Sequence, residues 1–401
     1  MRYALLGLLY DQDKEVELLE TIGYSVQPQV NQYQWGLIEG LNANLGTKID
    51  VFASIPTGSF PKHSKKLFIK QDLIDSSYGV NYIPFTAISG IRERQRKRRF
   101  FKALKKYINQ SEERVTLFVY SVYYPFTSII KKLKKKFCDK VEICLIVPDL
   151  PGKYGIERKN PIRRFLDRRH IKGQFESIKY VDKFVVLTDA MKEPLAIGDR
   201  KYAVVEGFLP NLSLPKDDLL VNDKKVILYT GVISQEIGIW DLIKEFTQIK
   251  RDDVELWICG TSNEQTDKIK EYSKNTDNRV KFLGFMPKSK ILSLQKRAFA
   301  LVNPRTNKDQ FTKYSFPSKT MEYMLSARPV VMYNLSGVPN EYLPYLFICK
   351  ESSEFPIKEQ LELLLSMDEK EIINLGNKAK TFVLENKNAV AQTKKIVEIL
   401  N

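Results

Sequence analysis

The sequence predicts an α/β protein with two domains, each built on a parallel sheet covered by helices. Short apolar runs of strand length alternate with segments of helical period along the chain. A polar segment with prolines, Pro210–Lys225, interrupts this series, and a second alternating series follows it. The 401 residues are enough for two cores of ordinary size. We therefore predict domains at residues 1–210 and 226–382, joined by a linker at 211–225.

In the first domain, strands are predicted where apolar residues run continuously, as they do in a sheet buried on both faces. These strands are Tyr3–Leu9, Ile49–Ser54, Asn81–Phe85, Val115–Ser121, Val141–Val147, Phe184–Thr188 and Tyr202–Glu206. Helices are predicted between them, for example at Gln32–Leu45 and Thr127–Phe137. Such alternation is typical of a Rossmann-like domain, in which parallel strands are joined by crossover helices.

The second domain repeats this alternation, so we expect a second Rossmann-like sheet facing the first across a cleft. Its predicted strands are Val226–Thr230, Val254–Cys259, Val280–Leu283, Phe299–Asn303 and Val330–Tyr333. Its predicted helices are Trp240–Ile249, Glu264–Tyr272, Lys288–Arg297, Ser318–Ala327, Lys358–Ser366 and a final helical segment, Glu369–Leu400.

Composition narrows the classes of function. His63 and His170 are the only histidines, which argues against a zinc site and against a catalytic triad with histidine. The four cysteines show neither metal spacing nor a disulfide framework, as expected for a reduced cytoplasmic setting. No apolar run is long enough to cross a bilayer, and the N-terminal MRYALLGLLY reads as a first strand rather than a signal peptide.

The net charge of +16 is concentrated in the first half of the chain. Residues 1–210 carry 36 Lys and Arg against 23 Asp and Glu, a net charge of +13. Residues 211–401 carry 28 against 25, a net charge of +3. The two halves therefore face different partners, and the partner of the first half is anionic.

The segment Ser315–Val331, which reads SFPSKTMEYMLSARPVV, carries the most specific signal of function. Pro317 opens a helix, which places Lys319 in its first turn and Glu322 on the same face, three residues on. A fixed cation and a fixed carboxylate at a helix start suit a phosphorylated sugar. Lys319 and backbone N–H groups can face phosphates, while Glu322 can accept hydrogen bonds from ribose hydroxyls.

This segment resembles the donor-binding helix of GT-B glycosyltransferases, specifically the retaining family 4 (group 1) enzymes. Glu322 matches the second acid of the family pattern, and SARPVV matches the turn and strand that follow it. The resemblance implies a GT-B fold and a nucleotide diphosphate sugar as co-substrate, with no separate cofactor and no metal. It also implies that a C-terminal helix, at residues 383–401, crosses back to the N-terminal domain.

Several residues are expected on the same rim, because ligands of parallel sheets bind beyond the carboxyl ends of the strands. Gly231, Gly260, Gly284 and Arg305 each follow a predicted strand of the second domain. By the resemblance, Gly231 would approach the phosphates and the backbone of Gly284–Met286 would meet the base. The expected donor-binding set is Gly231, Gly260, Gly284, Phe285, Met286, Arg305, Tyr314, Ser315, Phe316, Ser318, Lys319 and Glu322. Taken singly, each glycine reads equally as an ordinary turn residue.

The sequence departs from the family pattern at three positions. The arginine and lysine that usually follow the first glycine are replaced by Ile233 and Ile237, and the first acid is replaced by Tyr314. A diphosphate leaving group still needs cations or N–H donors. We infer that Arg305 and Lys319 neutralise it, with the N–H groups of 315–318 and Lys313. The altered sugar contact at Tyr314 leaves the donor sugar open and admits a weak or inactive enzyme.

In the first domain, Asp149 ends a predicted strand in VPDLPGKYG. Its position resembles that of a polar residue near the reacting bond in the family, where it could orient the acceptor hydroxyl or act as a base. The other interpretation is a turn-starting aspartate. Glu206 ends the last predicted strand and could touch the donor sugar. We thus expect Asp149, Lys319 and Glu322 to be the catalytic residues.

Two basic segments predict contact with an anionic membrane. Arg92–Ile108 has nine Lys or Arg and one acid, and its apolar residues fall on one helical face, as in a helix at a membrane interface. The alternative is a helix that packs this face on its own sheet. Lys131–Lys136 is the second segment, joined by arginines 163, 164, 168 and 169 in a loop at Lys153–Lys172.

The sequence thus predicts a peripheral enzyme on the cytoplasmic face of the cell membrane. It would transfer a sugar from a nucleotide diphosphate sugar to a lipid-linked sugar or a polysaccharide. Two alternatives stay open: a GT-B-like partner subunit that binds nucleotide sugar without catalysis, and a nucleic-acid-binding protein. No nucleic-acid-binding motif is recognisable in the sequence, so we do not expect the second.

Overall fold

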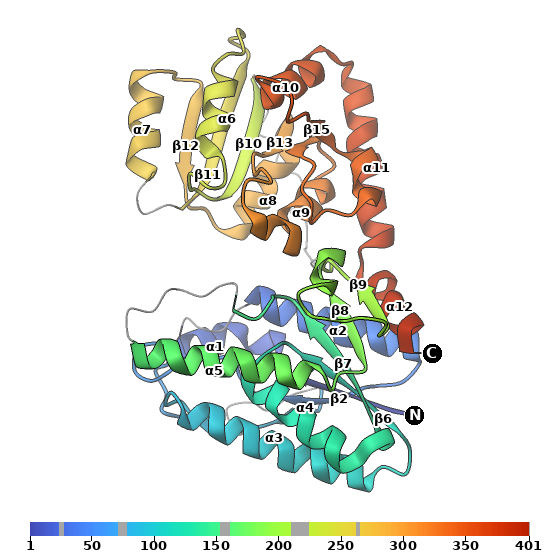
Figure 1. The fold of residues 1–401 in the computed structure, drawn as a ribbon. Coiled ribbons are helices and arrows are strands. Elements are labelled where there is room, and N and C mark those ends of the chain that lie inside the picture. Colours follow the sequence, from blue (N-terminus) through green and yellow to red (C-terminus); the bar gives the residue numbers. More distant parts are fainter. Residues whose placement is uncertain (24–27, 71–77, 153–160, 210–223, 262–264, 401) are drawn as a thin grey trace. The chain divides into compact units, whose positions relative to one another are not determined.

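The computed structural model describes residues 1–23, 28–70, 78–152, 161–209, 224–261 and 265–400. The chain forms two compact units, Met1–Phe208 with Ala389–Asn401 and Leu209–Asn388 (Figure 1). Each unit holds a parallel sheet with helices packed on it, so the predicted α/β fold of two Rossmann-like halves is confirmed. The predicted linker lies largely outside the described residues, and the predicted cleft stays a prediction.

The sheet of the first unit has the order β4-β2-β1-β6-β7-β8-β9, and all its strands are parallel. The strands are β1 (Arg2–Gly7), β2 (Asp50–Ala53), β4 (Asn81–Tyr82), β6 (Val115–Tyr120), β7 (Val141–Val147), β8 (Lys183–Val186) and β9 (Tyr202–Val204). Every residue of the central strands β6 and β7 is buried. This burial explains why these strands read as continuous apolar runs.

One predicted strand is divided. The run Asn81–Phe85 was expected to form a single strand, but only its first two residues, β4, join the parallel sheet. Its last residue begins β5 (Phe85–Thr86), which pairs antiparallel with β3 (Phe68–Ile69) in a separate ribbon. Pro84 lies between the two strands and has no N–H to donate to a sheet, which accounts for the break.

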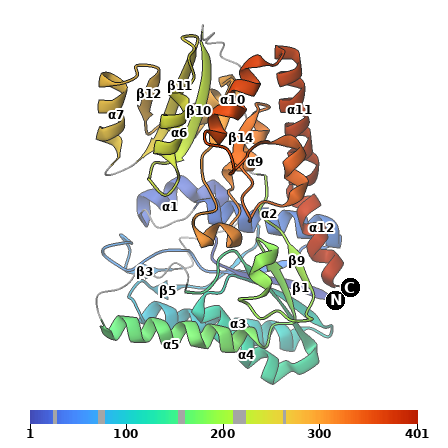
Figure 2. The same cartoon turned by 45° about the horizontal axis from the view of Figure 1, so that its top comes forward.

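Helices cover both faces of the first sheet (Figures 1 and 2). They are α1 (Glu15–Thr21), α2 (Pro28–Leu45), α3 (Ile91–Gln110), α4 (Tyr124–Phe137), α5 (Pro161–Ile178) and α12 (Ala389–Leu400), with short 3₁₀ turns at Gln12–Lys14, Cys138–Lys140 and Asp189–Lys192. α2 and α12 pack on one face, while α3, α4 and α5 lie side by side on the other.

The last helix completes the core of the first unit. Ile396 of α12 is fully buried in a cluster with Leu37 and Leu41 of α2. Asn44 at the end of α2 donates a hydrogen bond to Thr393 Oγ1 over 2.8 Å. The predicted helical segment Glu369–Leu400 is therefore two helices, α11 (Glu369–Asn386) and α12, and the first unit takes the chain from Ala389 rather than from 383.

The prediction of a loop at Lys153–Lys172 is wrong in its second part, because helix α5 begins at Pro161. Proline is favoured at the first position of a helix, since its missing N–H has no helical partner there. Arg164, Arg168 and Arg169 are exposed on this helix. Residues 153–160 lie outside the described residues.

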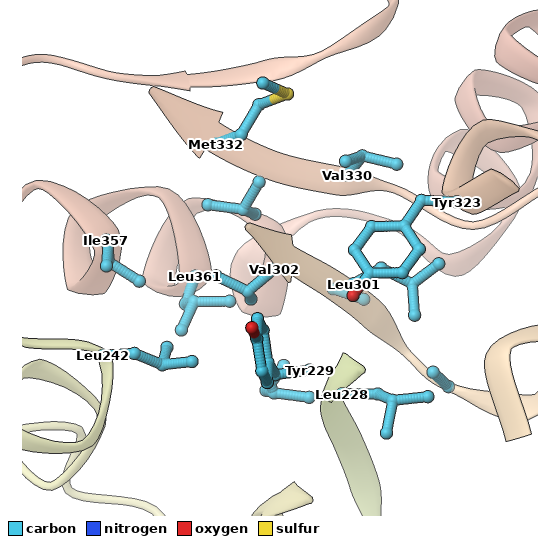
Figure 3. Packing of buried hydrophobic residues seen from close by; sticks show 14 of the residues in the cluster. Leu228, Tyr229, Leu242, Leu301, Val302, Tyr323, Val330, Met332, Ile357 and Leu361 are labelled. Carbon is cyan, nitrogen blue, oxygen red and sulfur yellow. The ribbon is translucent and has the colours of Figure 1, made fainter. Parts of the chain in front are cut away.

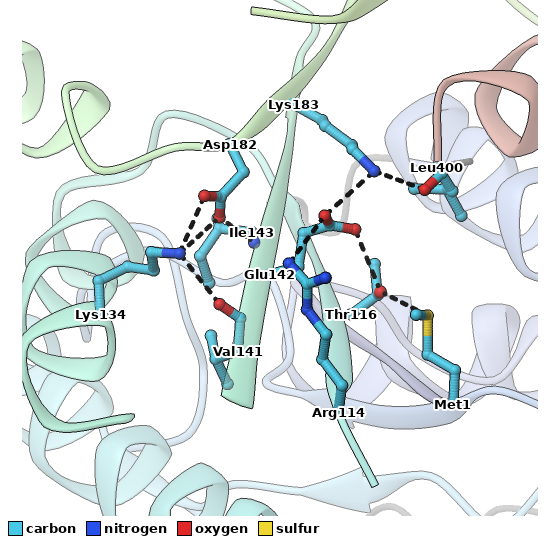
Figure 4. A network of polar contacts seen from close by, with 10 residues as sticks. All are labelled: Met1, Arg114, Thr116, Lys134, Val141, Glu142, Ile143, Asp182, Lys183 and Leu400. Atoms are coloured by element: carbon cyan, nitrogen blue, oxygen red, sulfur yellow. Dashed lines mark hydrogen bonds and ion pairs between the residues drawn. The ribbon is translucent and has the colours of Figure 1, made fainter. Parts of the chain in front are cut away.

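A polar network ties the amino ends of the strands in the first unit together (Figure 4). Lys134 of α4 donates to both carboxylate oxygens of Asp182, at 2.9 and 3.0 Å, and to the carbonyl of Val141. Lys183 donates to the carbonyl of Leu400 at 2.6 Å and pairs with Glu142 at 3.1 Å. The last turn of α12 is thereby fixed to β7 and β8.

The sheet of the second unit has the order β12-β11-β10-β13-β14-β15 and is parallel throughout. Its strands are β10 (Lys225–Val232), β11 (Val254–Thr261), β12 (Val280–Gly284), β13 (Ala300–Asn303), β14 (Val330–Tyr333) and β15 (Phe347–Cys349). Its helices are α6 (Ile239–Phe246), α7 (Thr266–Asn275), α8 (Lys288–Arg297), α9 (Lys319–Leu325), α10 (Pro356–Ser366) and α11, with 3₁₀ turns at Gln310–Tyr314 and Asn340–Tyr345.

The core of the second unit lies between this sheet and its helices. Figure 3 shows side chains of β10, β13 and β14 packed with those of α9 and α10. Strand β15 is absent from the predicted series because it has only three residues. Within the described part of the chain, no helix combines the length and the apolar character needed to span a bilayer.

Candidate functional site

Glycines at the carboxyl ends of adjacent strands leave the backbone of the second unit bare at one edge. Gly231 of β10 and Gly260 of β11 are direct partners in the sheet. A Cβ on Gly260 would lie 1.8 Å from the Gly231 carbonyl oxygen, so no side chain fits there. Gly284 ends β12 with a φ of +72°, a conformation that L side chains rarely adopt. This edge is therefore open to close approach by a ligand.

Helix α9 begins at Lys319, directly after Pro317 and Ser318, close to the predicted start. All of its residues after Lys319 are buried, so α9 is fixed against the sheet. The Lys319 Nζ lies 3.4 Å from Thr230 Oγ1 and 3.9 Å from Glu322 Oε1. A Cβ on Gly231 would lie 3.2 Å from the Lys319 side chain. The structure thus brings Lys319, Glu322 and Gly231 together at the end of β10.

Two residues of α8 that the sequence reasoning missed complete this cluster. Gln295 is fully buried and its Nε2 donates to Glu322 Oε1 at 2.7 Å and to Thr230 Oγ1 at 3.2 Å. Lys288, at the first position of α8, pairs with Glu322 Oε2. The helix itself was predicted with the correct bounds. Its two polar residues seven positions apart share one helical face, and this spacing was a usable signal.

The charged residues of the cluster shift one another's pKa values. Burial raises the pKa of the Glu322 carboxyl, but Lys319 and the hydrogen bonds from Lys288 and Gln295 outweigh it, so that the pKa lies below its ordinary value. Burial also lowers the pKa of the Lys319 ammonium, and the attraction of Glu322 opposes this only in part. Two lysines around one carboxylate leave a surplus positive charge, which suits an anionic ligand.

Tyr323, another residue that the sequence reasoning missed, connects α9 to β10. Its hydroxyl accepts a hydrogen bond from the Thr230 N–H at 2.9 Å and reaches the Thr230 carbonyl at 3.1 Å. Strand β13 pairs with β10 only at Ile227 and Leu228. Beyond that point, the Tyr323 hydroxyl takes the place of a neighbouring strand for the backbone of Thr230. Figure 3 shows Tyr323 among the apolar side chains of this core. The helix that carries Lys319 and Glu322 is thereby fixed to the strand that carries Gly231.

In the loop before α9, some side chains are buried in the core and others lie at the surface. Phe316 is buried and contacts the Tyr342 ring, with centroids 5.3 Å apart, so its side chain belongs to the core rather than to a ligand site. Tyr314 is buried, and Lys313 Nζ lies 4.9 Å from its ring centroid. Ser315 is half-buried and Ser318 is exposed.

The two isoleucines at the positions of the usual basic pair belong to the core. Ile233 is buried in the apolar cluster of the second unit, and Ile237 packs against that cluster. These two side chains therefore pack the β10–α6 loop against the core of the second unit. Arg305 is half-buried after β13, where its backbone N–H donates to Asn303 Oδ1 at 3.3 Å. Among the described residues, no carboxylate pairs with its guanidinium.

Phe285 is the most exposed of the large apolar residues at this edge, with 76% of its surface accessible. It follows Gly284 directly, while Met286 packs partly against the core. The structure therefore places one free aromatic face next to the glycine that ends β12.

The two acidic residues predicted in the first unit differ in their surroundings. Asp149 is exposed just beyond β7. The pKa of Tyr120 is raised, first by the burial of its own hydroxyl and then by the negative charge of Asp149. Glu206 is buried, and Lys395 of α12 lies 4.0 Å from its carboxylate. The prediction that Glu206 touches a sugar is not supported by this burial.

Comparison with known proteins agrees with this arrangement. Residues 213–382 match the family model "Glycosyl transferases group 1". These residues include β10 to β15 and therefore the whole cluster around Glu322. A search of curated proteins returned no match.

Solved structures share the fold over the whole chain. Sucrose-phosphate synthase from Thermosynechococcus elongatus has a TM-score of 0.65 and 17% identity, covering 100% of this chain and 98% of that chain. Anabaena HepE in complex with UDP gives 0.62 and 12%, covering 100% and 99%. The lipopolysaccharide outer core galactosyltransferase WaaB gives 0.60 and 16%, also covering 100% and 99%. At these identities the likeness shows the fold.

The family model and the fold together confirm the resemblance that the sequence predicts. The model covers the unit with the glycine edge and the Lys319–Glu322 helix, and the solved structures cover both units. The chain therefore has the fold of the GT-B glycosyltransferases, and its residues 213–382 match the group 1 glycosyl transferases.

Proposed function

We propose that this protein transfers a sugar from a nucleotide diphosphate sugar to a lipid-linked sugar or a polysaccharide at the cytoplasmic face of a membrane. The observation that carries the donor part is the cluster of Lys319, Glu322 and Gly231 within a group 1 domain. The UDP in the structure of HepE supports a nucleotide as the donor's carrier.

Each residue of the cluster has a role in this proposal. Glu322 accepts hydrogen bonds from the ribose hydroxyls, and Lys319 faces the diphosphate next to the bare backbone of Gly231. Arg305 supplies the second cation in place of the basic pair that Ile233 and Ile237 replace. These cations stabilise the negative charge that develops on the leaving diphosphate as the glycosidic bond breaks.

The acceptor chemistry is assigned to the first unit. Asp149 would orient the acceptor hydroxyl or accept its proton, and its exposure beyond β7 is compatible with either role. The transfer is proposed to retain the anomeric configuration, because the resemblance to the retaining family implies it. It is proposed to need no metal ion, because Lys319 and Arg305 neutralise the diphosphate.

Thermal unfolding in the presence of nucleoside diphosphates tests the donor site. A ligand that binds only the folded chain at 100 times its Kd adds about 2.7 kcal/mol of stability. We expect one nucleoside diphosphate to raise the melting temperature of the wild type and of Lys290→Ala, an exposed lysine on α8. Lys319→Ala should lose this increase. Absence of any increase in the wild type would reject the proposal.

A partner subunit without catalysis is the second candidate, and Tyr314 favours it. This buried tyrosine takes the place of the first acid of the family pattern. The two candidates differ in turnover. An active enzyme hydrolyses or transfers the donor sugar at a rate that Glu322→Ala lowers, whereas a partner subunit binds the donor and releases no nucleotide.

The membrane part of the proposal depends on the exposed cations of α3, α4 and α5, which lie side by side on one face of the first unit. These cations are Arg94, Arg98, Arg99, Lys102, Lys105, Lys106, Lys132, Lys135, Lys136, Arg164, Arg168, Arg169 and Lys172. Each cation near an anionic bilayer contributes about 1 kcal/mol. Phe165 on α5 is 64% exposed among them and could enter the lipid interface.

Two details of the predicted membrane contact change. The apolar stripe of α3 is buried, since Phe100, Leu104 and Ile108 are inaccessible, so this stripe cannot enter a bilayer. Lys134 is bound to Asp182 and is not available to lipid. Attraction to the membrane therefore comes from the outer face of the three helices.

Vesicle binding tests this surface. We expect binding to phosphatidylserine vesicles, and none to neutral vesicles. The double variant Lys102→Glu/Lys105→Glu should weaken binding at least about tenfold, because two attractive charges become repulsive. The control Lys268→Glu/Lys274→Glu changes exposed lysines of α7 in the other unit and should leave binding intact. Preferential binding to duplex DNA over the vesicles would favour the nucleic-acid alternative.

A further inference from the structure

The Glu322 carboxylate is held from two sides by residues of another helix. Gln295 Nε2 donates to Oε1 at 2.7 Å, and Lys288 pairs with Oε2. We propose that Gln295 and Lys288 are positioning residues, which hold Glu322 in the orientation that receives a ribose diol while Lys319 binds the diphosphate. This inference rests on the proposed donor site, because it assigns a ribose to Glu322.

The carboxylate keeps capacity for a diol after these contacts. A carboxylate offers about four acceptor positions. Gln295 takes one on Oε1 and Lys288 takes one on Oε2, so each oxygen retains a position for a hydroxyl. The side chain of Glu322 is 10% exposed, so a ligand reaches it from one side only. Two hydroxyls on adjacent carbons match two oxygens presented in this way.

Gln295 acts through Glu322 and cannot act on the ligand directly, because it is fully buried. Its amide nitrogen is shared between Glu322 and Thr230, which anchors the carboxylate to β10. The Gln295 Oε1 has no hydrogen-bond partner among the described residues. An unsatisfied buried acceptor costs about 1–3 kcal/mol. If the Gln295 amide were rotated by 180°, its Oε1 would face the Glu322 carboxylate and repel it. The hydrogen bond from Nε2 to Glu322 therefore explains why Oε1 is left without a partner.

Lys288 is the cation that stays paired with Glu322 when a donor binds. Lys319 is the more weakly attached lysine, since its Nζ lies 3.9 Å from Glu322 Oε1. It also contacts Thr230 at the end of β10, on the side of Gly231. A diphosphate near Gly231 attracts Lys319 away from the carboxylate. Lys288, whose side chain is half exposed, then remains as the counterion that keeps Glu322 ionised.

Discrimination between ribose and dideoxyribose tests these roles. The probe is the nucleoside diphosphate that gives the largest thermal increase, compared with its 2′,3′-dideoxy analogue by titration calorimetry. Two hydrogen bonds to a carboxylate predict that the wild type prefers the ribose form by roughly 10- to 100-fold. In Gln295→Leu and in Lys288→Met this preference should fall to about threefold or less, with the affinity for the dideoxy analogue unchanged.

Controls separate positioning from general damage. Lys290→Met removes an exposed lysine two residues away on α8 and should keep the full preference, as should the conservative Lys288→Arg. A preference retained in both Gln295→Leu and Lys288→Met overturns the inference. Equal weakening of both ligands also overturns it, because it indicates structural damage alone. A wild type that binds neither ligand, or both equally, removes the proposed ribose contact itself.

Discussion

At the scale of single residues, the Tyr323 hydroxyl makes the contact that joins α9 to β10. It pairs with both the N–H and the carbonyl of Thr230, and all these atoms are buried. We expect Tyr323→Phe to destabilise the protein by about 1–3 kcal/mol, because it leaves buried backbone groups unpaired. Urea unfolding measures this loss. Tyr33→Phe is the matched control, since the buried Tyr33 hydroxyl has no partner among the described residues and its removal should be nearly neutral.

The pKa of Glu322 gives a second prediction at this scale. Its lowered value in the folded chain means that the ionised form stabilises the fold above the unfolded value of about 4.3. This contribution is lost as the pH falls through the lower, folded value. The difference in unfolding free energy between the wild type and Glu322→Gln should therefore be larger at pH 7 than at pH 3. A difference that is constant or grows on acidification contradicts the lowered pKa.

At the scale of elements, the loop before α9 depends on a glycine in the connection after β14. A Cβ on Gly337 would lie 2.1 Å from the Ser315 carbonyl oxygen and 2.5 Å from that of Thr312. Gly337→Ala must therefore displace the segment that leads into Lys319. We expect it to weaken nucleotide binding by at least about tenfold, measured by titration calorimetry. Gly173→Ala in α5, where the atom nearest to the added Cβ is 3.6 Å away in the Tyr124 ring of α4, should bind like the wild type.

The elements also show how far the sequence could predict the site. Apart from the short β15, the strands and helices of the second unit were predictable, because their apolar runs are long and bounded by glycine or proline. The position of Lys319 and Glu322 on α9 followed from them. The contacts of Glu322 with Lys288 and Gln295 were not, because they join residues 34 and 27 positions apart across two helices. Helical period fixes which face a residue occupies, and only packing decides which helix that face meets.

In the first unit, the same limit explains why the sequence left two interpretations of α3 open. Its apolar stripe and basic face were correctly recognised, but the pattern alone fits both a membrane surface and a sheet. Burial of Phe100 and Leu104 decides for the sheet. Arg96, which the pattern counts as a surface cation, is buried and donates to Ser54 Oγ at 3.0 Å. The net charge counted from the sequence of a segment is therefore larger than the charge that its surface presents to a partner.

At the scale of the whole molecule, each unit has its own core, and the first unit is completed by the end of the chain. Ile396 is fully buried among residues of α2, although the whole second unit, Leu209–Asn388, lies between it and residue 208 in the sequence. We expect Ile396→Ala to cost about 2–5 kcal/mol, the usual loss for a buried aliphatic side chain. This loss should appear in the first unit alone.

Hydrogen exchange locates that loss. In Ile396→Ala the amides of β1, β6 and β7 should exchange faster, while those of β10 and β13 keep their protection, because exchange reports the stability of each unit separately. Leu364→Ala, at a fully buried position of α10, should give the reverse pattern. Nucleoside diphosphate should then slow exchange at β10 in Ile396→Ala as in the wild type, since the donor residues belong to the second unit. Loss of protection in both sheets in either variant would show that the two cores unfold together.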